Sequence, residues 1–222
     1  MDSTKDPLVV PRKFENLGLD QRECLDKIED LVRKHRVEFE RPPRPNAKLL
    51  VLDADCTLTC DDGKPRPYLQ IMLSRVTEKY DIILWSHERD HLSSRLNSLN
   101  VFGSRYNIIC YLNKKIKIEV NSNKYGTLCV KPLDFIWKNF PYDHRNTIMF
   151  DDKWQSYALN RQFGISTNRK DRSSNSENCE LEAVANYLDI IAKLDDLSIL
   201  HHNDWKDNLD RKSPQGIPFL PP

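Results

Sequence analysis

The stretch LLVLDADCTLT, residues 49–59, decides the fold of this chain. Four apolar residues run straight into Asp53, and a second carboxylate follows at Asp55. A short apolar run of this kind is typical of a strand that is buried on both faces of a parallel sheet. A carboxylate at the end of such a strand would lie on the floor of a crevice, where an unpaired charge is costly unless a cation neutralises it. The stretch therefore predicts a buried strand that opens onto a charged site.

Two more apolar runs also end on polar residues. Residues 82–85 (IILW) run into Ser86, and residues 147–150 (TIMF) run into Asp151 and Asp152. Apolar residues at helical spacing predict helices over 67–79, 88–100, 133–140 and 181–194. Alternating strands and helices favour an α/β fold with a doubly wound parallel sheet, whose ligands bind at the carboxyl ends of the strands. We therefore expect all three polar strand ends around one crevice.

The remaining segments are interpreted as additions to this frame. Apolar residues at helical spacing between 20 and 36 predict an amphipathic helix, whose apolar face we expect to dock onto the main domain. The short alternating runs at 107–111 and 116–120 predict a small β-hairpin insertion. We divide the chain into an N-terminal leader and helix (1–47), a core domain (48–206) and a polar tail (207–222).

The composition excludes several classes of protein. The chain has 222 residues, 39% hydrophobic and 30% charged, which is typical of a folded globular protein. Its 34 basic and 33 acidic residues give no overall attraction to nucleic acid or to an anionic membrane, and no apolar run approaches the roughly 20 residues that span a bilayer. The six cysteines form no CxxC pair, which argues against a zinc site. We expect neither a nucleic-acid partner nor a membrane partner.

The paired carboxylates of residues 53 and 55 suit phosphoryl transfer. A carboxylate can attack phosphorus and form an aspartyl-phosphate, while a second one protonates the leaving oxygen and later activates water. Mg²⁺ typically binds one or two carboxylates together with the substrate phosphate. Taken singly, each residue also has a structural explanation: solvated loop charges for the aspartates, a helix N-cap for Ser86 and a surface lysine for Lys131. The functional interpretation comes from the set as a whole.

Four motifs together resemble the haloacid dehalogenase superfamily. They are DADCT at 53–57, Ser86 after the second strand, Lys131 in CVKPL, and FDD at 150–152. Longer stretches resemble the FCP/SCP-type phosphatase domain, and most of all the ubiquitin-like-domain-containing CTD phosphatases, which are linked to the nuclear proteasome. These stretches are RPYL at 66–69, YDIILWS at 80–86, VKPL at 130–133 and NTIMFDD at 146–152.

The resemblance implies a Mg²⁺-dependent protein serine/threonine phosphatase of the nucleus, acting on a phosphoprotein such as the RNA polymerase II C-terminal domain or a proteasome subunit. It implies that Asp53 is the nucleophile, that Asp55 is the general acid/base, and that Thr57, Ser86 and Lys131 hold phosphate. It also implies a metal site formed by Asp53, by Asp55 through its backbone carbonyl, and by Asp151 and Asp152. Residues 59–81 leave no room for a large cap domain, which favours a phosphoprotein over a small metabolite.

The chain also departs from these relatives. We expect no ubiquitin-like fold before residue 48, which puts association with the proteasome in doubt. The flap at 60–64 is short, and KWQS at 153–156 differs from the usual sequence. A non-catalytic phosphatase-like binding module and a small-molecule phosphatase therefore stay open as alternatives. The basic run formed by Lys114, Lys115, Lys117 and Lys124 is either a steering surface for an acidic peptide or a solvated strand edge.

Overall fold

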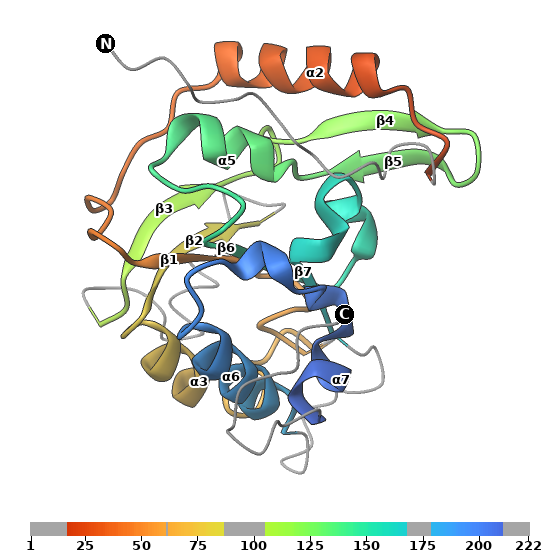
Figure 1. The fold of residues 1–222 in the computed structure, drawn as a ribbon. Helices are drawn as coiled ribbons and strands as arrows, with labels where there is room; N and C mark the ends of the chain where they lie inside the picture. The colour runs from red at the N-terminus through yellow and green to blue at the C-terminus, as the bar shows by residue number, and fades with distance from the viewer. Residues whose placement is uncertain (1–16, 61, 87–104, 168–178, 211–222) are drawn as a thin grey trace.

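The centre of the molecule is a parallel sheet of five strands in the order β3-β2-β1-β6-β7 (Figure 1). The computed structural model describes residues 17–60, 62–86, 105–167 and 179–210. The predicted helix over 88–100 lies outside these residues, and so does the polar stretch at 169–178. The strands of the sheet are β1 (Lys48–Leu52), β2 (Tyr80–Trp85), β3 (Ile108–Leu112), β6 (Thr147–Asp151) and β7 (Gly164–Ser166).

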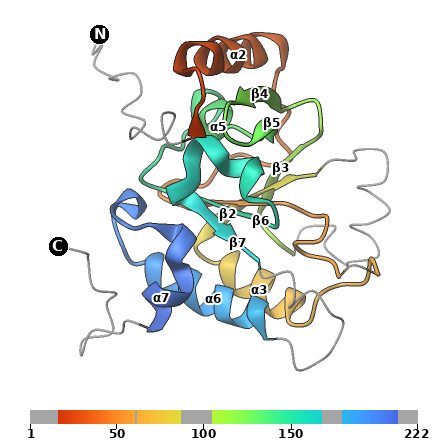
Figure 2. The ribbon, with the colours of Figure 1, turned by 90° about the vertical axis from the view of Figure 1, so that its right-hand side faces the viewer.

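Helices cover both faces of the sheet, which confirms the predicted doubly wound α/β fold (Figures 1 and 2). One face carries α2 (Gln21–Lys34), the hairpin β4–β5 (Ile118–Ser122 and Gly126–Val130), α5 (Leu133–Asn139) and the 3-10 helix η1 (Trp154–Phe163). The other face carries α3 (Leu69–Val76), α6 (Glu180–Ile191), the turns η3 (Leu197–Ile199) and η4 (His202–Asp204), and α7 (Trp205–Asp210). No helix in the described part of the chain is long and apolar enough to cross a membrane.

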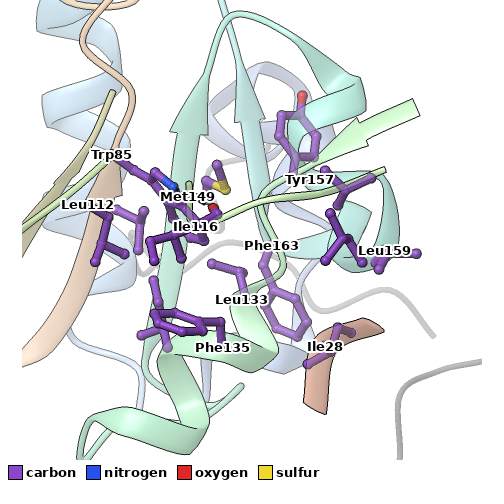
Figure 3. Packing of buried hydrophobic residues seen from close by; sticks show 14 of the residues in the cluster. Ile28, Trp85, Leu112, Ile116, Leu133, Phe135, Met149, Tyr157, Leu159 and Phe163 are labelled. Carbon is purple, nitrogen blue, oxygen red and sulfur yellow. Dashed lines mark hydrogen bonds between the residues drawn. The ribbon is translucent and has the colours of Figure 1, made fainter. Parts of the chain in front are cut away.

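The alternating sides of β1 divide the interior into two apolar clusters. Leu50 and Leu52 belong to the cluster shared with α3 and α6. Leu49 and Val51 belong to the cluster shared with α2, α5 and η1, part of which is drawn in Figure 3. Because successive side chains of a strand point to opposite faces, a continuous apolar run is what a strand needs between two helical layers.

The amphipathic helix α2 docks as expected. Asp20 caps its N-terminus by accepting a hydrogen bond from the amide of Glu23 at 3.0 Å. Cys24, Ile28 and Leu31 are buried in the cluster shared with α5 and the hairpin. The apolar face predicted from the sequence is therefore a packing surface of the main domain.

The predicted hairpin exists, and its predicted arm at 116–120 overlaps β4, but its other arm was assigned wrongly. The stretch at 107–111 forms most of β3, which pairs in parallel with β2 at the edge of the main sheet. The hairpin instead joins β4 to β5 in antiparallel register, from Ile118 opposite Val130 to Ser122 opposite Gly126. The burial explains the difference: β3 is almost wholly buried, as a strand between two layers is, whereas β4 alternates between buried and exposed residues.

His202, the first residue of η4, is a buried histidine that contacts α6 and η3. Its Nε2 donates to the carbonyl of Leu197 at 2.8 Å, so its Nδ1 accepts from the hydroxyl of Tyr187 at 2.6 Å. Burial lowers the pKa of His202 to about 4. The folded chain therefore holds this ring neutral, with the proton on Nε2.

We expect the free energy of unfolding to fall as the pH drops from 6.5 to 4, because the unfolded chain binds a proton that folded His202 excludes. The stabilisation from neutral His202 is fully present above pH 6.5. About 3 kcal/mol of it is lost by pH 4, because each unit of difference between the unfolded and folded pKa is worth about 1.4 kcal/mol. Urea denaturation between pH 7.5 and 4 measures this slope, and His202→Gln should flatten it. The same slope in both proteins would contradict the prediction.

Candidate active site

The polar residues predicted at the strand ends lie at the carboxyl edge of the sheet. Asp53 follows β1, Ser86 follows β2, and Asp151 is the last residue of β6. The amide of Asp53 donates to the carbonyl of Phe150 at 2.9 Å, which ties the end of β1 to the end of β6. Asp53, Ser86 and Asp151 are all buried, so the site begins at the floor of the crevice.

Lys131 lies at the centre of the site, directly after β5. Its Nζ donates to Asp53 Oδ1 at 2.6 Å, to Asp151 Oδ2 at 2.8 Å and to the carbonyl of Trp85 at 2.9 Å. The lysine is only 5% exposed. Although burial disfavours its charge, the two carboxylates outweigh that effect and raise the pKa of Lys131. A surface lysine, the structural alternative, is therefore excluded.

The charge of Lys131 does not fully offset the effect of burial on Asp53. Burial raises the pKa of Asp53 to about 7; Lys131 opposes the increase, and the neighbouring Asp151 adds to it. A carboxylate with such a pKa is stabilised in its charged form by any further cation that approaches it. The site thus favours the binding of additional positive charge.

Three carboxylates are grouped closely enough to hold a metal ion. Asp53, Asp151 and Asp152 each offer an oxygen, and these oxygens lie within 4.8 Å of one another. Thr57 connects two of them, because its hydroxyl donates to Asp53 Oδ2 at 3.1 Å and accepts from the amide of Asp152 at 3.0 Å. A donor set made only of oxygens suits a hard cation such as Mg²⁺. The residues therefore fit the metal that the sequence implied.

Asp55 stands apart from this carboxylate group. Its Oδ2 accepts a hydrogen bond from the hydroxyl of Ser86 at 3.0 Å. The next residue, Cys56, has a left-handed backbone with φ of 59°, and its amide donates to Thr59 Oγ1 at 3.0 Å. The carboxylate of Asp55 thus contacts Ser86, whereas that of Asp53 contacts Lys131, and the turn that begins at Cys56 follows both aspartates. The side chain of Asp55 is not part of the carboxylate group that could hold a metal ion.

The comparisons with known proteins agree with this geometry. The model of the NLI interacting factor-like phosphatase family matches residues 48–198, a range that holds every site residue predicted from the sequence. This chain belongs to that family. The ubiquitin-like domain-containing CTD phosphatases 1 of Homo sapiens and Xenopus laevis are each 36% identical to it over 208 residues. That match covers 88% of this chain and 65% of each relative, so the chain spans about two thirds of their length.

The predicted resemblance to the FCP/SCP-type phosphatase domain is confirmed by the family match. A solved structure titled "The Structure of Fcp1, an essential RNA polymerase II CTD phosphatase" is also similar, at 13% identity and a TM-score of 0.40. That similarity covers 88% of this chain and 69% of the other.

The segment at 153–156, which we expect to differ from the usual sequence of these phosphatases, supports the site. The carbonyl of Ser156 accepts from the amide of Lys131 at 2.7 Å, and the amide of Lys153 donates to Asp151 Oδ1 at 2.9 Å. Both contacts use backbone atoms of the segment. These two contacts therefore do not depend on the side chains of the segment.

A buried ion pair behind the site was missed by the sequence analysis. Arg66 Nη2 donates to Glu180 Oε2 at 2.7 Å, and Arg66 Nη1 donates to the carbonyl of Thr57 at 3.3 Å. The side chains of this arginine and glutamate are 0% and 3% exposed. The pair fastens the loop that carries Asp53 and Asp55 to the start of α6. Nothing local in the sequence indicates it, because 114 residues separate the partners.

We expect Glu180→Met to lower the free energy of unfolding by about 3–5 kcal/mol, because it takes the buried Arg66 out of its ion pair. Arg66→Met should cost less, because Glu180 keeps Lys206, whose Nζ lies 3.3 Å from Glu180 Oε1. The double variant should lose much less than the sum, since it removes both charges. Urea denaturation of the four proteins measures the coupling. Additive losses would show that the two side chains do not act as a pair.

Proposed function

We propose that this chain is a Mg²⁺-dependent phosphoserine/phosphothreonine phosphatase that acts through an aspartyl-phosphate on Asp53. The contact of Lys131 with both Asp53 and Asp151, beside Asp152, carries this proposal. It supports a pocket that supplies a nucleophile, a cation for the phosphoryl oxygens and ligands for a hard metal. Membership of a phosphatase family and relatives named CTD phosphatases add to this support.

In the first step, an oxygen of Asp53 attacks phosphorus, and the bond from phosphorus to the serine or threonine oxygen breaks. Asp55 gives its proton to that leaving oxygen. Lys131, Thr57 and Ser86 hold the phosphoryl oxygens. Mg²⁺, when bound by the grouped carboxylates, offsets the negative charge that the phosphoryl group brings.

In the second step, Asp55 takes a proton from water, whose oxygen attacks the phosphorus of the aspartyl-phosphate. The bond to Asp53 breaks, inorganic phosphate leaves, and both carboxyl groups return to their starting states. Before the phosphoryl group binds, the hydroxyl of Ser86 donates its one proton to Asp55 Oδ2. The depth of Asp53 limits other reactions, because this aspartate is only 3% exposed.

The described segments around the site favour a protein substrate. Between β1 and α3 the chain forms only a short flap, closed by a bridge between Thr59 and Pro65. The hairpin β4–β5 packs against α2, where Lys27 Nζ donates to the carbonyl of Glu119 at 2.7 Å. Neither segment has the size of a domain that would enclose a metabolite. We therefore propose a phosphorylated polypeptide segment as the substrate.

The name of the relatives supplies the first substrate to test. They are called CTD phosphatases, so we propose a phosphorylated peptide from the C-terminal domain of RNA polymerase II as a substrate. Location in the nucleus is proposed on the same basis. Rates on sugar phosphates that exceed those on phosphopeptides would favour a small-molecule phosphatase, and phosphopeptide binding without turnover would favour a non-catalytic module.

Asp53→Asn should lower the hydrolysis of p-nitrophenyl phosphate by about a thousandfold or more, because the amide is a poor nucleophile. Removing Mg²⁺ with EDTA should abolish the activity of the unmodified protein, and adding the metal back should restore it. Asp30→Asn, at a partly exposed acid on α2 that lies outside the site, is the matched control and should keep full activity. Turnover without metal, or activity in Asp53→Asn, would refute the mechanism.

Asp55→Asn should slow the second step more than the first. Nitrophenolate leaves without needing a proton, whereas hydrolysis of the aspartyl-phosphate needs a base to activate water, which is worth about 10²–10⁴-fold. Rapid mixing should therefore show a burst of nitrophenolate followed by slow turnover. A linear time course at the rate of the unmodified protein would remove Asp55 from this role.

A further inference from the structure

A groove of about 480 Å³ lies beside the candidate site, on the outer side of β3. One wall is the connector after α2, from His35 to Glu38. The opposite wall is the end of β3 and the turn that follows it, from Cys110 to Ile116. The amide of Glu40 donates to the carbonyl of Ile109 at 2.9 Å and keeps the connector against the strand.

The groove is basic. Arg36, Lys114 and Lys115 line it, with Glu38 as its one carboxylate. Among the residues that the structure describes, no ion pair neutralises any of these three cations. Lys114 and Lys115 belong to the basic run that the sequence suggested as a steering surface for an acidic peptide. The third comes from the connector, 78 residues away from Lys114 along the chain (114 − 36).

The turn that carries the two lysines is fixed to the candidate site. The amide of Ser86 donates to the carbonyl of Leu112 at 3.0 Å, and Trp85 Nε1 donates to the carbonyl of Ile116 at 3.0 Å. The carbonyl of Trp85 in turn accepts from Lys131 at 2.9 Å. The chain between Leu112 and Lys114 spans at most about 7 Å, so the groove begins close to the phosphate-binding end of β2.

The turn is also closed by its own hydrogen bonds. The amide of Ile116 donates to the carbonyl of Asn113 at 2.9 Å, and the amide of Lys115 donates to Asn113 Oδ1 at 2.9 Å. These bonds fix the backbone from which both lysine side chains extend. A ligand therefore meets preset positive charges and does not have to order a loose loop.

We propose that this groove binds anionic side chains, carboxylate or phosphate, that flank the reacting phosphoserine or phosphothreonine of the substrate. The inference rests on the proposed phosphatase function and names the substrate class: acidic or multiply phosphorylated segments. An extended peptide advances about 3.3 Å per residue, so the recognised charges lie about two to four residues from the reacting one. A polypeptide is favoured over nucleic acid because the groove adjoins a site for phosphoprotein.

The experiment compares phosphoserine peptides of equal length whose flanks carry Glu, Ala or Lys at two to four residues on either side. At 50 mM salt, kcat/KM should be about tenfold higher for the acidic peptide than for the neutral one, and the advantage should shrink as salt is raised. Lys114→Glu with Lys115→Glu, or Arg36→Glu alone, should remove the preference. Both should leave the hydrolysis of p-nitrophenyl phosphate unchanged, because these side chains do not touch the reacting atoms.

Lys193→Glu is the matched control, since Lys193 is exposed in the turn after α6 and lies outside the groove. It should keep the preference for the acidic peptide. Equal kcat/KM for all three peptides, or a preference that survives the charge reversals, would overturn the inference. An RNA oligonucleotide that binds the groove and is lost with the same variants, without any effect of the peptide flanks, would also overturn it in favour of nucleic acid.

The two proposals can fail separately. If p-nitrophenyl phosphate and all peptides resist hydrolysis, the phosphatase proposal fails. Fluorescence anisotropy of the same labelled peptides then tests the groove alone: binding of the acidic peptide that weakens about tenfold in Lys114→Glu with Lys115→Glu would support it. If p-nitrophenyl phosphate is hydrolysed but the flanks have no effect on turnover or binding, only the groove inference falls.

Discussion

The buried contact of Lys131 with Asp53 and Asp151 is the interaction on which the rest of the site depends. Three carboxylates whose oxygens lie within 4.8 Å of one another repel, and burial adds a desolvation cost to the charges of Asp53 and Asp151. A cation among them is therefore a physical requirement of the fold. Because Lys131 follows β5 directly, the hairpin has to lie where it delivers that lysine to the strand ends. Fold and site are in this way coupled through one ammonium group.

A buried charge also holds a loop in place elsewhere at the sheet. Asp81 on β2 is wholly buried; it accepts from Arg44 Nε at 2.6 Å and from the hydroxyl of Tyr142 at 2.6 Å. Arg44 lies between α2 and β1, so this contact holds the N-terminal segment to the domain. The same segment supplies Arg36 to the basic groove, although residue 36 lies before the range that the family model matches, 48–198. If the groove binds substrate as proposed, substrate selection is shared between the family domain and a segment outside it.

The sequence predicted the sheet well because parallel strands between two helical layers need continuous apolar runs, and β1, β2 and β6 have them. The error at the hairpin has the same origin. Residues 108–112 are a buried run that was interpreted as one arm of a hairpin, because strand type cannot be derived from neighbours along the chain alone. The pairing of Arg66 with Glu180 could not be predicted, since contacts between distant residues have no local signal.

The sequence by itself determined which residues lie at the strand ends, since the apolar runs stop at Asp53, Ser86 and Asp151, and it determined that two carboxylates share one turn. Only the tertiary structure decided which partner each of those residues contacts. It placed Asp53 against Lys131 and Asp55 against Ser86. It also brought the connector beside the turn after β3 to form the basic groove. The physical reason is that local patterns report burial, whereas the pairing of charges depends on distances that only packing sets.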